Sequence, residues 1–495
     1  MTDWYGGHDA VAQLRAGNDL LMPGTSAQTA AILAGLKNGQ LATAQLDADV
    51  RRVLELVLKS PTFKGLPYSS QPALQADAAT ARQAAAESMV LLRNEGAALP
   101  LAAGQTLALF GNTSYNLIAG GTGSGDVNRA YTISIAQGLN RSGFSINEPF
   151  RQAYTNYLKA EIAKLPRKKG LLDPAPVIAE MSPDAAQVQQ QAQAADVAIV
   201  TLGRSAGEGG NRKVTDDFAL TARETALLQQ VSPAFRAAGK KVVVVLNVGG
   251  VVETASWRGL ADAILLAWQP GQEGGHAVAD VLSGQVNPSG KLTSTFPMAY
   301  ADIPYGADYP GKVRPGAAPA TRFLSGQESE NTYAEGIFVG YHYFNTFGQQ
   351  PAYAFGHSLS YTSFGYGPLK LSAPALTGKV TASLTNTGKA AGREVVQLYV
   401  SAPKGKLTKP HSELQAFAKN ALLAPGKAQT LTFTLTPNDL ASYDSAASAW
   451  VTDAGAYGLQ AAASSVDVRQ RYTASDQTRG SRQKPAPAGS GRSGG

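Results

Sequence analysis

The sequence predicts a multidomain α/β protein in which an α/β domain with a mostly parallel sheet precedes a β-sandwich. Two observations predict this order. From about residue 81 to 300, apolar strand-like runs alternate with helical stretches, and from about residue 369 short runs of alternating polarity are separated by turn residues. Alternating strands and helices are typical of a parallel sheet covered by helices, whereas consecutive alternating strands are typical of a sandwich.

Near-continuous apolar runs mark the strands of the first domain. A strand that is covered on both faces is apolar throughout its length. The runs are TLALFG (106–111), VAIVTLG (197–203), KVVVVLNVG (241–249) and AILLAW (263–268). One intervening helix begins with TARE, where Thr221 and Glu224 form a capping box. In doubly wound sheets ligands bind beyond the carboxyl ends of the strands, so the loops that follow these runs are the place to expect a site.

Turn-separated alternating strands predict the second domain. They are KVTASLTNTG, EVVQLYVSAP, QTLTFTLTP and AYGLQAAA, a pattern typical of a sandwich of immunoglobulin or fibronectin type III kind. We assign 81–300 to the α/β domain, 301–365 to an aromatic, loop-rich connector, 366–473 to the sandwich and 474–495 to a disordered tail.

Helices are predicted before the first domain, in residues 28–58. In LDADVRRVLELVL, apolar residues recur at spacings of three and four, which places them on one face of a helix. They are Leu46, Val50, Val53, Leu54, Val57 and Leu58. Gly39 is expected to close the preceding helix. Residues 61–80 contain PTFKGLPYSSQP and are expected to be a linker.

Composition narrows the function classes. The chain has 495 residues, 44% of them apolar and 16% charged, which is typical of a globular protein of about three domains. It has no cysteine, which excludes disulfides and thiolate sites, and no apolar run of 18 residues, so no membrane span is expected. The net charge of +7 falls to about +4 without the tail, too little to indicate a nucleic-acid partner.

The first candidate loop is GNTSYNLIAGGTGSGDVN (111–128), which follows a predicted strand. It lacks the glycine spacing of a dinucleotide site, because Asp126 stands where the third glycine should be, and it lacks a phosphate-binding GxxxxGK[ST] motif. Two interpretations remain open. The loop is a tight exposed turn, or its glycines let the backbone and Ser124 approach a polar ligand.

The second candidate loop is GRSAGEGGNRKVTDD (203–217), in which glycines flank Glu208. Taken alone, Glu208 is best explained as a solvated loop residue. Together with Asp3 it would supply the two carboxylates that glycoside hydrolysis requires. Glu273 is a rival proton donor that also follows a strand, but it is expected to open the next helix, where an acidic residue is favoured anyway.

Other chemistries have weaker support. No GxSxG nucleophile elbow with a histidine partner is present, which argues against a serine hydrolase. The five histidines show no metal-ligand spacing, and no cofactor is predicted. They are His8, His276, His342, His357 and His411.

Many ordered motifs resemble glycoside hydrolase family 3, of the β-glucosidase and β-xylosidase kind. They are TDW (2–4), AGNDLLMPG (16–24), AAESMVLLRNEGAALPL (85–101), GTGSGD (121–126), GEGGNRK (207–213), LLAWQPGQEGGHAVADVLSGQVNPSGKLTSTFP (265–297), YAEGIFVGYHYFNT (333–346), FGHSLSYTSF (355–364) and GREVVQLYV (392–400). The resemblance covers nearly the whole chain up to the tail.

The resemblance implies both a fold and a site. The fold is a (β/α)₈ barrel, an α/β sandwich and a fibronectin type III-like domain, with residues 1–60 as the remnant of the barrel. Asp3 corresponds to the nucleophile and Trp4 to a wall of the sugar site. Glu208 corresponds to the proton donor, and Ser124 to a residue that approaches the −1 sugar.

The implied function is retaining hydrolysis that releases a β-linked, glucose-type sugar from the non-reducing end of an oligosaccharide or glycoside. The parent enzyme would be periplasmic or secreted. Since a full barrel needs about 250 residues, we expect an N-terminally truncated chain with little or no activity alone. The alternative is a non-catalytic remnant that binds carbohydrate or protein. Gly210 and Asn211 also depart from the Tyr and Asp that relatives carry after Gly-Glu-Gly.

Overall fold

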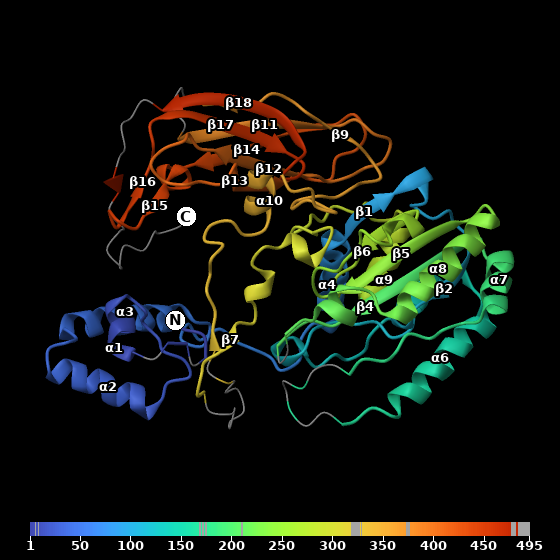
Figure 1. The fold of residues 1–495 in the computed structure, drawn as a ribbon, viewed down its shortest axis with the longest axis horizontal. Helices are drawn as coiled ribbons and strands as arrows, with labels where there is room; N and C mark the ends of the chain where they lie inside the picture. Colours follow the sequence, from blue (N-terminus) through green and yellow to red (C-terminus); the bar gives the residue numbers. More distant parts are fainter. Residues whose placement is uncertain are drawn as a thin grey trace. The chain divides into compact units, whose positions relative to one another are not determined.

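The computed structural model describes residues 1–4, 6–7, 9–167, 170, 173, 176–208, 211–317, 327, 329–372, 377–476 and 482–483 (Figure 1). The chain divides into two compact units. One contains Met1–Ala73 with Tyr443–Val451 and Ser481–Gly495, and the other contains Leu74–Ser442 with Thr452–Gly480. Each unit is described by itself.

In the described residues of its N-terminal part, the first unit contains three α-helices, α1 (Ala10–Arg15), α2 (Ser26–Lys37) and α3 (Thr43–Lys59). Helix α2 begins at a capping box made by Thr25 and Gln28, and Gly39 follows its end with φ of +76°. The predicted helix over 46–58 is confirmed as part of α3. Its apolar face is about half exposed, with Leu54 at 55% and Val57 at 47%.

Six described strands form the sheet of the α/β domain in the order β1-β6-β5-β4-β2-β3. Strand β1 is antiparallel to β6, and the other neighbours pair in parallel, so the expectation of a mostly parallel sheet is confirmed. The four predicted strands correspond to β2, β4, β5 and β6. The bounds are β1 Val90–Asn94, β2 Thr106–Phe110, β3 Ser145–Ile146, β4 Val197–Arg204, β5 Lys241–Val248 and β6 Ala263–Leu266.

Helices cover both faces of this sheet (Figure 1). Successive side chains of a strand point to opposite faces. Accordingly Leu107 and Leu109 belong to one apolar cluster, which includes α4, α5 and α9, while Ala108 and Phe110 belong to another, which includes α6, α7 and α8. The bounds are α4 Leu74–Ser88, α5 Ile135–Arg141, α6 Glu148–Ile162, α7 Ala185–Ala194, α8 Ala222–Ala237 and α9 Gly274–Leu282.

The order of the strands reverses between β2 and β4. The chain passes from β2 through α5 to β3 at the sheet edge, and then through α6 and α7 to β4 on the other side of β2. A crevice opens at such a switch point, beyond the carboxyl ends of the two strands. The loops that start at Gly111 and Ser205 therefore leave the sheet next to each other.

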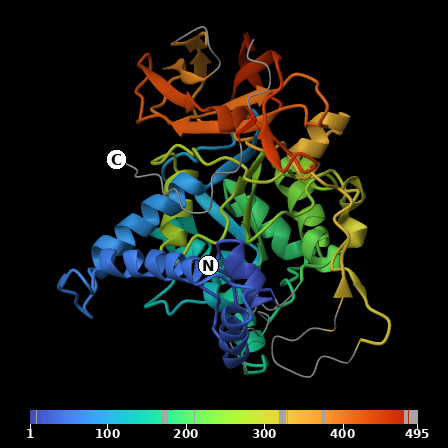
Figure 2. The same cartoon turned by 90° about the vertical axis from the view of Figure 1, so that its left-hand side faces the viewer.

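The sandwich follows as two sheets, drawn orange to red in Figure 2. Strand β11 pairs with β10, β14 and β9, and the other sheet has the order β13-β12-β17-β18. The four predicted strands are confirmed as β11, β12, β14 and β17. The bounds are β9 Phe364–Tyr366, β10 Lys370–Leu371, β11 Gly378–Asn386, β12 Val395–Ser401, β13 Glu413–Lys419, β14 Ala428–Leu435, β17 Gly455–Ala462 and β18 Val468–Asp476.

Short elements complete the described fold. They are α10 Tyr341–Phe347, β7 Lys312–Val313, β8 Ser329–Glu330, β15 Ser442–Asp444, β16 Ala449–Val451 and β19 Arg482–Gln483. Of the tail expected from residue 474, residues 474–476 complete β18 and 482–483 pair with β16, and the rest lies outside the described residues. Within the described part of the chain, no helix is long and apolar enough to cross a membrane.

Candidate functional site

Ser124 and Glu208 meet where the loops after β2 and β4 lie together. The Ser124 hydroxyl donates to Glu208 Oε1 at 2.6 Å, and the Ser124 amide donates to Oε2 at 3.2 Å. The Thr122 hydroxyl also donates to the Glu208 carbonyl oxygen at 2.5 Å. Both Ser124 and Glu208 are exposed. The carboxylate is therefore oriented by the glycine-rich loop while it stays open to a ligand.

Glycines allow the two loops to approach this closely. A Cβ atom on Gly121 would lie 2.2 Å from the Ala206 carbonyl oxygen, and one on Gly123 would lie 2.5 Å from Glu208 Cβ. A Cβ on Gly207 would lie 2.3 Å from the Thr122 amide nitrogen. These separations are shorter than van der Waals contact allows. The glycines therefore let the two loops lie in direct contact.

A buried asparagine, absent from the residues predicted from the sequence, fixes the first loop to the sheet. Asn247 is fully buried near the end of β5. It accepts from the Ile118 amide at 2.8 Å and donates to the carbonyl oxygens of Ile118 at 2.9 Å and Trp268 at 2.8 Å. Trp268 has a φ of +55°, which is unusual for a bulky residue. Asn247 is the single polar residue within the apolar run VVVVLNVG, and this exception was the sequence signal that could have identified it.

The second loop is anchored beyond Glu208. Arg212 contacts Asp217 at 2.7 Å and the Val251 carbonyl oxygen at 2.7 Å. Burial raises the pKa of Asp217, but hydrogen bonds from Arg212 and the Lys213 amide outweigh it and hold the pKa below its ordinary value. The Tyr309 hydroxyl donates to Asn211 Oδ1 at 3.0 Å, so an aromatic residue from the connector contacts one of the two positions that depart from the family pattern. The other, Gly210, lies outside the described residues.

A buried ion pair lies at the base of the second loop. Arg204, the last residue of β4, contacts both carboxylate oxygens of Glu224 at 2.6 Å. The two side chains are only 10% and 6% exposed. Glu224 also accepts from the Thr221 amide, which confirms the predicted capping box. Glu224 therefore serves both in the capping box of α8 and as the counter-ion of Arg204, the residue after which the second loop begins.

Glu180 is another buried carboxyl, and it lies beside the first loop. Burial raises its pKa to about 8, although the Asn112 amide donates to its two oxygens at 3.0 and 3.1 Å. No motif or spacing in the sequence marked this residue.

The rival acid Glu273 takes the N-cap position of α9, as the sequence predicts. Tyr131 donates to one carboxylate oxygen at 2.5 Å, and His276 Nδ1 lies 2.6 Å from the other. Burial raises the pKa of Glu273, but these two partners outweigh it and leave the pKa below its ordinary value. A lowered pKa leaves a smaller fraction of the carboxyl protonated, and only the protonated form can donate to a leaving group.

Asp3 and Trp4 lie in the first unit, whereas Ser124 and Glu208 lie in the second. The Trp4 amide donates to Asp3 Oδ1 at 2.6 Å, and both side chains are exposed. The preceding Thr2 is tied to residues 20–22, since its amide donates to the Leu20 carbonyl oxygen at 3.0 Å and its hydroxyl accepts from the Met22 amide at 2.8 Å. These two bonds hold the residue that precedes the acidic-aromatic pair to residues 20–22.

In the described part of the chain, no group of three or more His, Asp or Glu side chains is arranged so that it could hold a metal ion. His8 lies outside the described residues.

Comparison with protein families finds two matches along the chain. Residues 89–341 match the glycosyl hydrolase family 3 C-terminal domain, and residues 394–465 match the fibronectin type III-like domain. The first match contains the Ser124–Glu208 contact, and the second covers most of the sandwich.

Individual relatives agree with these matches. Beta-glucosidase A of Butyrivibrio fibrisolvens is 35% identical over 76% of this chain and 48% of its own length. An exo-alpha-(1->6)-L-arabinopyranosidase of Bifidobacterium longum is 32% identical over 94% of this chain and 58% of its own. The chain thus spans roughly half the length of these curated relatives.

Solved structures extend the comparison to the fold. Beta-glucosidase 3B of Thermotoga neapolitana, solved in complex with glucose, is 41% identical and superposes with a TM-score of 0.87 over 98% of this chain and 67% of its own. A GH3 beta-glucosidase of Bifidobacterium adolescentis is 31% identical, with a TM-score of 0.75 over 96% of this chain and 64% of its own.

Proposed function

The chain belongs to glycoside hydrolase family 3, and from this premise we propose that it carries the catalytic groups of a retaining β-glucosidase-like enzyme. The substrate is an oligosaccharide or glycoside with a β-linked, glucose-type sugar at its non-reducing end. The observation that carries the proposal is the pair formed by Ser124 and Glu208 at the switch point of the sheet, where an exposed carboxylate is held by two donors.

Asp3 is the nucleophile and Glu208 the acid and base of this reaction. An Asp3 oxygen bonds to the anomeric carbon while the glycosidic C–O bond breaks, and the proton of Glu208 goes to the departing oxygen. Water then attacks the same carbon and gives its proton to Glu208, and the ester bond to Asp3 breaks. This double displacement requires the two carboxyl groups to lie about 5–5.5 Å apart.

The remaining residues position these groups. Trp4 forms a wall of the sugar site, and Ser124 orients Glu208 and reaches toward the −1 sugar. Glu273 is buried and engaged by Tyr131 and His276, whereas Glu208 is exposed, which favours Glu208 over that rival as the proton donor.

Hydrolysis of 4-nitrophenyl β-glucoside tests the proposal. It is measured on the chain and on the chain extended at its N-terminus to the length of its relatives, and the variants are compared in the extended protein, because the chain alone is expected to have little or no activity. We expect Asp3→Asn and Glu208→Gln each to lower kcat/KM by at least about 10²-fold, since each removes a group that transfers a proton or forms a bond. Asp47→Asn, at an exposed position of α3, is the matched control and should leave the rate unchanged. An Asp3→Asn protein with full activity would overturn the nucleophile assignment.

The second candidate function is a non-catalytic module that binds carbohydrate or protein. The residues that match the family's C-terminal domain (89–341) and the fibronectin type III-like domain (394–465) would form this module. In that case the extended protein and both of its variants would show equal, background hydrolysis, while cellobiose would still bind to the chain in equilibrium titration.

A further inference from the structure

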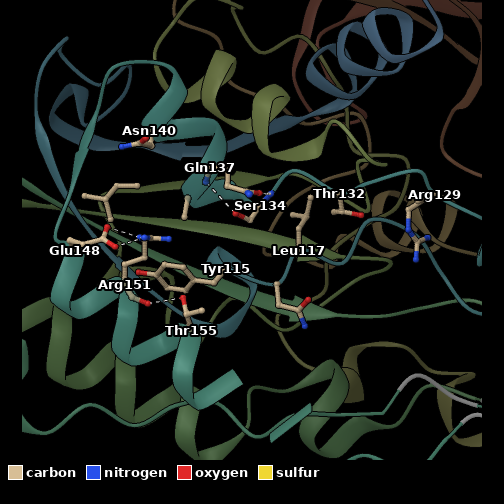
Figure 3. A pocket seen from close by; sticks show the side chains of 13 residues that line it. Tyr115, Leu117, Arg129, Thr132, Ser134, Gln137, Asn140, Glu148, Arg151 and Thr155 are labelled. Carbon is tan, nitrogen blue, oxygen red and sulfur yellow. Dashed lines mark hydrogen bonds and ion pairs between the residues drawn. The ribbon is translucent and has the colours of Figure 1, made fainter. Parts of the chain in front are cut away.

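A pocket lies beside the edge strand β3, and no step of the proposed hydrolysis uses it (Figure 3). Its volume is about 640 Å³, within the range of small-molecule sites. The lining comes from the loop after β2, from α5, from Ile146 of β3 and from Glu148–Thr155 in the first part of α6, all within the second unit.

The pocket exists because β3 is short. Among the described residues it pairs only with Thr106 and Leu107 of β2, and no described strand lies beside the rest of that edge. The Tyr115 side chain lies along this part of the β2 edge, where its hydroxyl donates to the Leu109 carbonyl oxygen at 2.9 Å. One ring face of Tyr115 stacks on Tyr154, with centroids 5.1 Å apart. The Tyr115 ring thus becomes a rigid apolar part of the pocket wall, beside Leu117 and Ile146.

The charges of the pocket are balanced. Arg151 forms an ion pair with Glu148, in which Nε lies 2.7 Å from Oε2. The other lining cation, Arg129, contacts Asp126 at 3.2 Å. Since each guanidinium has a carboxylate partner, the pocket offers no uncompensated charge to an anion such as a phosphate.

Neutral hydrogen-bonding groups are available instead. The capping box of α5 uses the Ser134 hydroxyl and Gln137 Oε1. Within the described residues, Gln137 Nε2 and the side chains of Asn116, Thr132 and Asn140 have no protein partner. Figure 3 shows Thr132, Gln137 and Asn140 among the side chains that line the cavity. Amides and hydroxyls of this kind both donate and accept.

We propose that this pocket is a second, non-catalytic saccharide site that binds a neutral pyranose. The hydroxyls of the sugar would form hydrogen bonds with the four neutral polar side chains, Asn116, Thr132, Gln137 and Asn140. The C–H surface of the sugar would pack on the wall formed by Tyr115, Leu117 and Ile146. A polar lining around a small apolar surface suits a polyhydroxylated neutral ligand and disfavours an anion or an apolar molecule. The site is independent of Asp3 and Glu208.

Hydrogen exchange measured by mass spectrometry, with glucose as the probe, tests this site separately from the catalytic one. Peptides over 132–141 and 148–155 report on the pocket, and peptides over 120–126 and 204–213 report on the Ser124–Glu208 site. We expect glucose to slow exchange of the pocket peptides at least twofold. Asn140→Trp should fill the pocket, so that at least ten times more glucose is needed for the same protection. Glucoside hydrolysis should not change.

Asn156→Trp is the matched control, because Asn156 is an exposed α6 residue outside the lining, and it should keep full protection. Thr132→Val is a second, smaller test that removes one hydroxyl and should weaken protection at least twofold. Protection by glucose that is unchanged in both Asn140→Trp and Thr132→Val would overturn the proposal. So would protection of the pocket peptides by sulfate in place of glucose. The effect of Glu208→Gln on hydrolysis tests only the proposed function and does not bear on glucose binding in this pocket.

Discussion

The Ser124 hydroxyl holds the Glu208 carboxylate at 2.6 Å across a separation of 84 residues. This contact joins the loops that follow β2 and β4, where the strand order reverses. A carboxylate on a glycine-flanked loop would otherwise sample many positions. The bond to Ser124 gives it one orientation, with its exposed side free to meet a substrate.

Gly123→Ala should disrupt this arrangement. Gly123 has a φ of +65°, and a Cβ there would lie 2.5 Å from both Cβ and Oε2 of Glu208. We expect kcat/KM for 4-nitrophenyl β-glucoside to fall at least about tenfold, because a small displacement of a catalytic group is costly. Gly125→Ala is the matched control, since its Cβ would meet nothing within 4 Å, and it should stay within twofold of the unmodified protein. Equal losses in the two variants would argue against close approach as the role of Gly123.

Glu273→Gln should retain hydrolysis within about tenfold, since Glu273 is already engaged by Tyr131 and His276 and its pKa lies below the ordinary value. Reaction of 4-nitrophenyl β-glucoside with the variant provides the measurement. A loss as large as that of Glu208→Gln would make Glu273 the better candidate for the proton donor.

Glu224→Gln should destabilise the second unit by about 3 kcal/mol, the lower end of the range for leaving one member of a buried pair uncompensated. Chemical denaturation followed by tryptophan fluorescence would measure the change. Glu148→Gln is the control, because the Glu148–Arg151 side chains are 63% and 41% exposed, and it should cost less than about 1 kcal/mol. Similar losses from both variants would show that burial of the Arg204–Glu224 pair is not decisive.

Glu180 should make stability fall as the pH rises. Burial raises its pKa from 4.5 to about 8, so the folded protein holds a proton that the unfolded chain releases near pH 4.5. The stabilisation is complete below pH 4.5 and is lost as the pH rises to about 8, by up to roughly 1.4 kcal/mol per pH unit.

Glu180→Gln should therefore flatten the dependence of the unfolding free energy on pH between 4.5 and 8 and raise stability most at pH 8. Denaturation curves at pH 5, 6.5 and 8 would measure this. Asp77→Asn, at an exposed position of α4, should leave the dependence unchanged. A Glu180→Gln protein with the same pH dependence as the unmodified chain would contradict the assignment.

The sequence predicted the strands that carry the site but not the side chains that support it. Long apolar runs identified β4 and β5, whereas β3 has two residues and gives no periodicity. The glycines of both loops were visible, and strand order at the switch point explains why the loops meet. The pairing of Arg204 with Glu224 and the burial of Glu180 depend on tertiary packing, which local sequence does not encode.

The product that azide forms with a Glu208→Ala variant tests the central claim most directly. With 2,4-dinitrophenyl β-glucoside, whose leaving group needs no proton, the glycosyl-enzyme should form but react slowly with water, because no base remains. We predict that azide raises turnover at least tenfold and yields β-glucosyl azide, with net retention. No acceleration, or formation of α-glucosyl azide, would contradict the assignment of Glu208 as the acid and base of a double displacement.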